Sequence, residues 1–441
     1  MGIRRHLRTA LAGSLLFGAI VVASVFVGSL PASASPAYAV TNTIAVGSEP
    51  WGVAVDPNTS TVYASNYLSN TVSVISEATD TAAHTIAVGS YPHGVAVDPN
   101  TGTVYVADDT LNKKGTVSVI SVATETVTNT IAVGSSPDAV AVDPNTGTVF
   151  VSNDTSNTVS VISEATDTVT NTIPVGVVGE GSGGTPLSLA VDPNTGTVYV
   201  ANYKGGSVWV ISEATDTVTK TIRGFGTDTV LGVAVDPNTG TVFVGNYKNN
   251  SLIMISEATD TVTKTIVGVG GAYGPKAVAV DPDTGTVYVA GNNTVVISEA
   301  TDTVTNKIPG ADSWGVAVDP DRGGLGGNVF VTNLNPQSSG TVSVITQIPT
   351  VTAVSPNSGP TSGGTAITIT GTGFVSGATV VIGQGTGTVG AIAATDVKVV
   401  SPTEITAVTG GGSKVNVFNL FVTTPGGTSQ ANYSGDEFTY H

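Results

Sequence analysis

One segment, Val-Asp-Pro-Asn-Thr-Gly-Thr-Val-Tyr-Val, recurs in close variants along this chain of 441 residues. Its copies are spaced by 42, 45, 49, 44, 45 and 38 residues, as measured between their aspartates at Asp56, Asp98, Asp143, Asp192, Asp236, Asp281 and Asp319. A period of about 40 to 45 residues is typical of a four-stranded propeller blade. The repeat therefore predicts a β-propeller with seven blades.

Each repeat contains four short β-branched runs, A to D, which we place from the inside of the ring outward. The second repeat shows them at Gly94 to Val97, Thr103 to Ala107, Thr116 to Ser121, and Thr126 to Val133. Runs such as Val-Ser-Val-Ile are apolar or small on both faces, so both faces need cover, which blades packed around an axis provide. No long helical pattern follows the first forty residues, and we expect an all-β protein.

The last repeat lacks one strand. Its A, B and C runs lie at Gly315 to Val318, Asn328 to Thr332 and Thr341 to Ile345, but no D run follows them. A sequence of the D type, Val-Thr-Asn-Thr-Ile-Ala-Val-Gly, occurs instead at Val40 to Gly47, before the first A run. We therefore expect the N-terminal strand to complete the last blade and close the ring.

The N-terminus has the pattern of a signal peptide. Arg4, Arg5 and Arg8 precede an apolar run from Leu11 to Leu30, and Ala37-Tyr38-Ala39 is a small-x-small cleavage pattern. We predict that residues 1–39 are removed and that the protein is secreted or displayed at the cell surface, with no transmembrane segment after cleavage. An uncleaved membrane anchor is the alternative, but it would leave no linker before the closing strand.

Charge and composition exclude several kinds of function. Removing the three arginines lowers the formal net charge from -17 to -20, so we expect no nucleic-acid partner. The chain has no cysteine, which excludes disulfides and thiol chemistry. Only His84, His93 and His441 remain after cleavage, and a site joining all three is not expected. The acidic Ser-Glu-Ala-Thr-Asp-Thr turns favour local capping over calcium binding. We predict no metal and no cofactor.

The repeats resemble the YVTN family of β-propellers, known from prokaryotic surface-layer and exported proteins. The likeness rests on Val-Tyr-Val-Ala-Asn-Tyr at Val198 to Tyr203 and on Thr-Val-Ser-Val-Ile-Ser at Thr158 to Ser163. It extends from Val40 to Ile345, and we assign residues 40–346 to the propeller. The resemblance implies the fold and leaves the activity open, because propellers host unrelated functions.

The remaining residues, 347–441, resemble an IPT/TIG domain, an immunoglobulin-like β-sandwich of receptors and bacterial envelope proteins. The motifs that carry this likeness are Val354 to Pro360, Gly363-Gly364-Thr365, Ile367 to Phe374, and the closing Phe438-Thr439-Tyr440. Thr409-Gly410 departs from the usual Thr-Pro. The resemblance implies a spacer or a module that contacts protein or carbohydrate.

A candidate ligand site follows from the geometry of an up-and-down sheet. The A-B and C-D turns share one face of the ring, whereas the B-C loops and D-A connections share the other. The first face is nearly copied from repeat to repeat, and the second face varies. The residues that open the A runs there are Trp51, His93, Asp138, Leu187, Leu231, Lys276 and Trp314. The B-C loops add Asp109, Asp154 and Leu334 as well as Tyr67, Tyr203 and Tyr247.

These residues favour binding over catalysis. We predict a ligand site made of Trp51, His93, Asp138, Lys276, Trp314, Tyr67, Tyr203 and Tyr247, with no catalytic residue. The expected partner is a glycan, a peptide or a protein of the cell envelope, and a monomer is expected. In the alternative interpretation, the two tryptophans only plug the channel. A lactonase or lyase at the mouth is the rival function, but such chemistry needs paired acid and base groups.

Overall fold

The computed structural model describes residues 37–110, 113–176, 184–227, 229–271, 274–310, 312–320, 327–334, 339–383, 387–431 and 435–441. These residues form strands and turns and contain no α-helix, which confirms the all-β class. In the same part of the chain, no helix is long and apolar enough to cross a membrane. Residues 1–36 of the predicted signal peptide lie outside the described residues.

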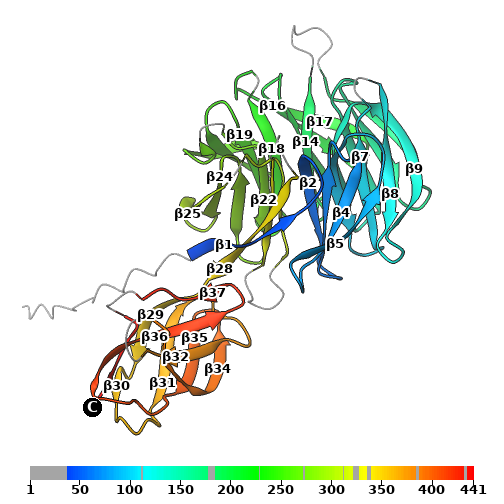
Figure 1. Ribbon diagram of the computed structural model, residues 1–441. Coiled ribbons are helices and arrows are strands. Elements are labelled where there is room, and N and C mark those ends of the chain that lie inside the picture. Colours follow the sequence, from blue (N-terminus) through cyan, green and yellow to red (C-terminus); the bar gives the residue numbers. More distant parts are fainter. Residues whose placement is uncertain are drawn as a thin grey trace, which may run out of the picture. The chain divides into compact units, whose positions relative to one another are not determined.

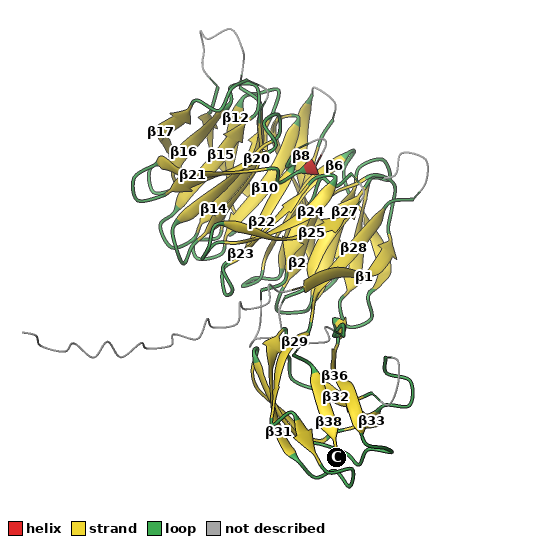
Figure 2. Ribbon diagram, turned by 90° about the vertical axis from the view of Figure 1, so that its left-hand side faces the viewer, coloured by secondary structure: helices red, strands yellow, loops and turns green. Residues whose placement is uncertain are grey.

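Strands β1 to β28 make up the propeller. Within the described residues they form seven antiparallel sheets of four strands, and the A strands of neighbouring sheets contact one another in a closed circle (Figure 1; Figure 2). The predicted seven-bladed propeller is thereby confirmed.

The first four blades are, from A to D, β2 (Pro50–Asp56), β3 (Thr61–Asn66), β4 (Thr71–Ser76) and β5 (Thr81–Ala87); β6 (Pro92–Asp98), β7 (Thr103–Asp108), β8 (Lys114–Ser121) and β9 (Thr126–Ser135); β10 (Pro137–Asp143), β11 (Thr148–Asn153), β12 (Thr158–Ser163) and β13 (Thr168–Pro174); and β14 (Pro186–Asp192), β15 (Thr197–Asn202), β16 (Ser207–Ser212) and β17 (Thr217–Arg223). The last three blades are β18 (Val230–Asp236), β19 (Thr241–Asn246), β20 (Ser251–Ser256) and β21 (Thr261–Val267); β22 (Ala277–Asp281), β23 (Thr286–Ala290), β24 (Asn293–Ser298) and β25 (Thr303–Pro309); and β26 (Val316–Val318), β27 (Val329–Asn333), β28 (Thr341–Ile348) and β1 (Ala37–Ala45).

The N-terminal strand closes the ring, as the sequence predicted. Strand β1 is the outer strand of the last blade and pairs antiparallel with β28, from Ala37 opposite Ile348 to Ala45 opposite Thr341. Figure 1 shows the blue β1 beside the yellow β28. The strand begins at Ala37, three residues before Val40, so it includes the Ala37-Tyr38-Ala39 cleavage pattern.

The burial of each strand follows its place in the blade. The B and C strands are buried on both faces, as in β3 and β4, because the faces of neighbouring blades cover them. The outer D strands are largely exposed, as in β21, where Thr, Lys and Val side chains face solvent and Ile266 is buried. One apolar cluster joins Tyr63 and Val74 of the first blade to Val104 of the second. Each such fully buried valine stabilises the fold by about 1.5–3 kcal/mol.

Polar side chains also link neighbouring blades on the face of the A-B and C-D turns. Asp143 begins one A-B turn and accepts the N–H of Asn145 at 2.8 Å. The Asn145 amide donates to the carbonyl of Pro193 in the next blade at 2.6 Å. Thr146 of the same turn donates to Glu213 Oε1, also in the next blade, at 2.5 Å. This pattern recurs in other blades, so side-chain hydrogen bonds of the repeated turns hold neighbouring blades together.

The C-terminal domain is the predicted immunoglobulin-like sandwich. Its first sheet has the order β29 (Thr350–Ser355), β31 (Ala366–Thr372), β35 (Glu404–Val408) and β34 (Thr395–Ser401). The second has the order β30 (Ser358–Gly359), β38 (Glu437–Tyr440), β36 (Asn416–Thr424), β32 (Thr379–Ile382) and β33 (Ile392–Ala393), with β37 (Gly427–Thr428) beside β36. Ile369, Phe374, Leu420, Phe438 and Tyr440 are fully buried between the sheets.

Candidate ligand-binding mouth

Backbone hydrogen bonds define the face on which the variable loops lie. The N–H of Tyr67, in the B-C loop of the first blade, donates to the carbonyl of Glu49 in the preceding connection at 2.9 Å. Asp154 and Ser136 repeat this bond at 2.8 Å. Glu49 and Ser136 have φ values of 51° and 52°, a conformation that costs about 1 kcal/mol for a residue with a side chain. B-C loops and D-A connections therefore meet at one rim of the ring.

A pocket opens at this rim, over the central channel. Its volume is 310 Å³, and all seven blades contribute to it. The residue near the start of each A strand lines it, namely Trp51, His93, Asp138, Leu187, Leu231, Lys276 and Trp314. We call this pocket the mouth.

Small residues one position further on let the A strands approach closely. A Cβ atom added to Gly52 would lie 2.5 Å from the carbonyl oxygen of His93 in the next blade. One added to Gly94 would lie 2.7 Å from the carbonyl oxygen of Asp138. Since such contacts are sterically forbidden, these glycines allow the inner strands to pack side by side.

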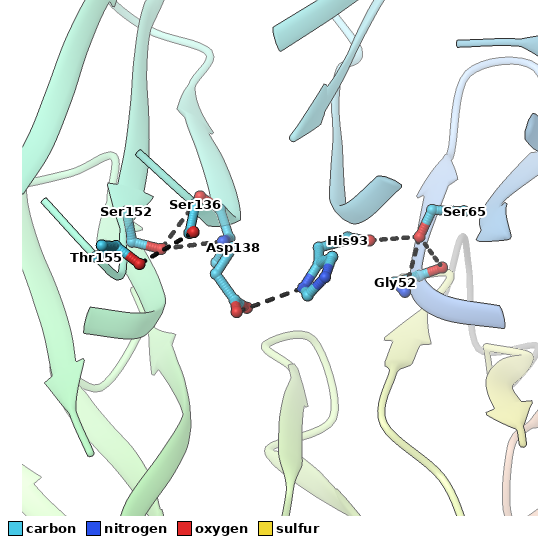
Figure 3. A network of polar contacts seen from close by, with 8 residues as sticks. Gly52, Ser65, His93, Ser136, Asp138, Ser152 and Thr155 are labelled. Carbon is cyan, nitrogen blue, oxygen red and sulfur yellow. Dashed lines mark hydrogen bonds and ion pairs between the residues drawn. The ribbon is translucent and has the colours of Figure 1, made fainter. Parts of the chain in front are cut away.

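Hydroxyl groups of the B strands fix the backbone that carries the mouth residues. Ser65 accepts the N–H of Gly52 at 2.9 Å and donates to the carbonyl of His93 in the next blade (Figure 3). Thr332 does the same at the closure, accepting the N–H of Gly315 at 2.9 Å and donating to the carbonyl of Trp51 at 3.1 Å. One buried hydroxyl thus ties the inner strands of two blades together.

Aromatic rings gather on one side of the mouth. Trp51 and Trp314 stack with their ring centroids 4.5 Å apart, and His93 lies 4.5 Å from Trp51 on the centroid distance. Tyr67 extends the cluster at 5.4 Å from Trp51, and Tyr91 lies 5.0 Å from Tyr67. These contacts make a continuous aromatic wall from the last blade to the second.

Two charged pairs flank that wall. His93 Nδ1 lies 3.4 Å from Asp138 Oδ2, and Figure 3 shows the two side chains pointing toward each other. Burial opposes protonation of His93, but Asp138, followed by Asp109 and Asp154, outweighs it and raises the pKa of the imidazole. Lys276 pairs with Asp312, and its Nζ lies 4.3 Å above the Trp314 ring.

Some donors at the mouth have no acceptor among the described residues. The indole N–H groups of Trp51 and Trp314 are buried and make no hydrogen bond there, and the same holds for Nε2 of His93. A buried donor without an acceptor costs about 1–3 kcal/mol. A ligand with acceptor oxygens can satisfy these groups.

The structure brings five of the eight predicted site residues into the mouth, namely Trp51, His93, Asp138, Lys276 and Trp314. Tyr67 contacts Trp51 and His93 from the rim. Tyr203 and Tyr247 lie in the B-C loops of the same face but do not line the pocket.

Two residues of the site were missed by the sequence analysis. Tyr91 and Asp312 both precede an A strand, and each reaches a mouth residue or its neighbour. Their position in a variable D-A connection was the signal that could have identified them.

The described residues contain no group of three or more His, Cys, Asp or Glu side chains placed to hold a metal ion. The mouth groups His93, Asp138 and Lys276 all carry or accept protons, but each charged group there already has an intramolecular partner. Their geometry suits orientation of a polar ligand.

Comparisons with known proteins agree with this architecture. The IPT/TIG domain family matches residues 349–440, and the family of lactonases with a seven-bladed β-propeller matches residues 103–227. No curated protein matches the chain. The resemblance to the YVTN family stays a prediction.

A solved structure of Kuenenia stuttgartiensis hydrazine synthase is similar to this chain, with a TM-score of 0.58 and 17% sequence identity. The alignment covers 68% of this chain and 96% of that one. At such low identity the likeness concerns the fold alone. A propeller followed by a TIG domain fits a binding or scaffold role.

Proposed function

We propose that this protein is an exported binding protein of the cell envelope and that its propeller mouth holds a glycan or peptide group. The observation that supports this most is the mouth itself, where the residues that differ between repeats line one pocket of 310 Å³. Such a volume is at the small end of ligand pockets, so the group is the size of one sugar or of one or two amino acids. If the partner is a protein, it would insert one side chain or one attached sugar into the mouth.

The chemistry of the mouth supports this ligand class. The Trp51–Trp314 stack offers aromatic surface to the apolar face of a sugar or to a side chain. The His93–Asp138 and Lys276–Asp312 pairs can orient hydroxyl, amide or charged groups. The two unpartnered indole N–H groups favour a ligand with acceptor oxygens.

The envelope location is supported by sequence alone. The arginines and apolar run at the N-terminus have the order of an export signal. The match of residues 349–440 to the IPT/TIG domain family implies a module like those that contact protein or carbohydrate in receptors and bacterial envelope proteins. We place the protein outside the cytoplasm on these two observations.

An array experiment tests the binding function. The protein without its leader is applied to arrays of glycans, peptidoglycan fragments and short peptides, and hits are measured by calorimetry. We expect saturable binding of one class with one site per chain. Absence of saturable binding to every class would contradict the proposal.

The lactonase match at residues 103–227 favours one rival function, hydrolysis of a lactone at the mouth. It covers parts of blades two to four and leaves out Trp51, Lys276 and Trp314. A panel of lactones tested with and without divalent metal ions distinguishes the two functions. Turnover that is lost on substitution of His93 or Asp138 would replace the binding proposal with an enzymatic one.

A further inference from the structure

The closing strand includes residues that the first cleavage pattern would remove. In β1, Ala37, Tyr38 and Ala39 pair with Ile348, Gln347 and Thr346 of β28. Cleavage after Ala39 would remove three pairs from the ladder that closes the ring. The structure therefore contains information about where the leader ends.

Tyr38 does more than extend the ladder. Its ring meets the ring of Tyr288 in the sixth blade edge-on, with centroids 5.9 Å apart and planes at 80°. The two hydroxyl oxygens are 3.3 Å apart, with Tyr288 donating to Tyr38. Tyr38 also packs on an apolar cluster that contains Ile308, Val316 and Ile345 from the last two blades.

Most other seams between blades show what Tyr38 replaces. At a typical seam a glutamate from the C-D turn of one blade reaches the A-B turn of the preceding blade, as when Thr195 donates to Glu257 Oε1 at 2.7 Å. The same glutamate lies close to the aspartate of that turn and to Tyr199 in the adjoining B strand.

The seam between the first and second blades is an exception, because Val122 stands at the position of the glutamate and Thr59 donates to Asp56 at 2.8 Å.

The seam between the sixth and seventh blades has no such glutamate. Chain order places Gln347 at the equivalent position, and Gln347 belongs to β28 and pairs with Tyr38. Tyr38 instead lies close to Asp281 and contacts Tyr288, which are the equivalents of Asp192 and Tyr199. Thr284, with no glutamate to bind, donates to Asp281 at 2.8 Å. Tyr38 thus occupies the place that the glutamate of the C-D turn takes at a typical seam.

We propose that signal peptidase cleaves after Ala34 and not after Ala39, so that the mature chain begins at Ser35 and keeps Tyr38. This inference rests on the proposed export of the protein. Ala32-Ser33-Ala34 is a second small-x-small pattern, and it follows the apolar run that ends at Leu30. In the cleavage, water adds across the Ala34–Ser35 peptide bond and leaves a carboxylate on Ala34 and an amine on Ser35.

The two sites are equivalent by their residue pattern, because both place alanine at the first and third positions before the bond. The structure separates them because Ala32 to Ala34 precede the closing strand, whereas Ala37 to Ala39 are built into it. Only the upstream site leaves the last seam with its side-chain contact.

The first experiment expresses the full chain in a bacterium with a general secretory pathway and determines the N-terminus and intact mass of the exported protein. We expect a chain that begins at Ser35. A chain that begins at Val40 would overturn the inference while leaving export intact. A chain that keeps Met1 would overturn the inference. If that chain is found in the membrane fraction it is the uncleaved anchor, and if it is found in the cytoplasm it also overturns the export on which the inference rests.

Two matched variants test the choice of site. Ala34→Val places a bulky residue before the proposed bond, and Ala39→Val does so before the alternative bond while remaining compatible with a β-strand. We expect Ala34→Val to block or shift processing and Ala39→Val to be processed as the parent. The opposite pattern would overturn the inference.

The stabilising contact is measured on the exported protein with Tyr38→Phe and Tyr38→Ala. The phenylalanine variant keeps the ring contact with Tyr288, so its melting temperature should stay within a degree or two of the parent. The alanine variant should melt about 4 °C lower or more, since it loses the partly buried ring and its contacts with Tyr288 and the apolar cluster. Equal melting temperatures for the parent and Tyr38→Ala would show that the seam does not use Tyr38.

Discussion

Trp51 and Trp314 stack with their ring centroids 4.5 Å apart, although they come from the first and the last repeat of the propeller. The aromatic wall of the mouth therefore stands on the seam where the ring closes. Thr332 supports the same seam by binding the backbone of both blades. Closure of the ring and the shape of the candidate site are thus coupled.

Deletion of β1, residues Ala37–Ala45, should disrupt both the closure of the ring and the aromatic wall of the mouth. The deletion exposes the edge of β28 and uncovers the apolar cluster around Ile44 and Val344. We expect a melting temperature at least 10 °C lower, aggregation, and loss of the near-ultraviolet circular dichroism of the stacked indoles. A deletion variant that melts within a degree of the parent would show that the ring closes without this strand.

The carboxyl groups between blades should make the propeller more stable in mild acid. Burial, followed by Glu213, raises the pKa of Asp143 to about 6, despite the opposing hydrogen bond from Asn145. Burial and Asp319 raise the pKa of Glu77 to about 7. A raised pKa means that the folded state binds more protons than the unfolded state, so this stability is present below about pH 4 and is lost as the pH rises through 6 to 7.

Melting curves between pH 4 and pH 8 measure this effect. The melting temperature of the parent should fall across this range, with a slope against pH that Glu213→Gln and Glu77→Gln together reduce. The reduction corresponds to on the order of 1 kcal/mol of unfolding free energy for each pair. Glu404→Gln, in the C-terminal domain, is the control and should leave the slope unchanged. Unchanged slopes in the double variant would rule out proton sharing between the blades.

Asp108 stands at a position where other blades have asparagine, such as Asn66, and its replacement by asparagine should stabilise the propeller. The equivalent Asn66 donates from its amide to Thr71 and Ser73, each at 3.0 Å. Asp108 instead accepts from Ser118 at 2.7 Å, and burial raises the pKa of its carboxyl to about 6. Since the folded pKa is raised, the protonated carboxyl stabilises the propeller below about pH 4. This stability is lost as the pH rises through 6, and at higher pH the ionised Asp108 destabilises the fold by a constant amount.

Asp108→Asn should therefore stabilise the protein at pH 8, by up to about 3 kcal/mol, and change little at pH 4. Chemical denaturation at both values measures the difference. If the variant were less stable at pH 8, the charged form of Asp108 would have a partner that the neutral amide cannot use.

The C-terminal domain should fold without the propeller. Residues Thr350–His441 contain a complete core in which Ile369, Phe374 and Phe438 are fully buried. Tyr440 closes it by donating to the carbonyl of Gly410 at 2.6 Å. The isolated domain should unfold in one cooperative transition, and Phe374→Ala should lower its stability by about 3–5 kcal/mol. An unfolded spectrum for the isolated domain would contradict this boundary.

The fold could be predicted from the sequence because every repeat shows the same order of strand runs and turns. The turns around Asp98 and Asp143, the missing D run after Ile345 and the spare run at Val40 to Gly47 together determine the number of blades and the closure. The start of the closing strand could not be predicted, because Ala37 and Ala39 satisfy both a strand and a cleavage pattern.

The site was predictable in its inner ring and less so at its rim. Trp51, His93 and Trp314 follow from their fixed place in the A strand. Side-chain directions in the connecting loops depend on local backbone conformation, as at Tyr91 with its φ of 50°. That conformation is set by hydrogen bonds between loops, and the sequence pattern does not predict these bonds.

The most direct test of the proposed function compares the two faces of the ring with the tightest binder from the glycan and peptide arrays. Trp51→Ala with Trp314→Ala removes the stacked pair from the mouth, and Thr166→Ala with Thr215→Ala changes two exposed residues in C-D turns of the opposite face. Loss of aromatic anchors commonly costs about 2 kcal/mol or more, so calorimetry on folded proteins should show binding weakened more than about tenfold by the tryptophan pair and unchanged by the threonine pair. If the folded tryptophan variant keeps full affinity and the threonine variant loses it, the ligand binds the repeated face and not the mouth.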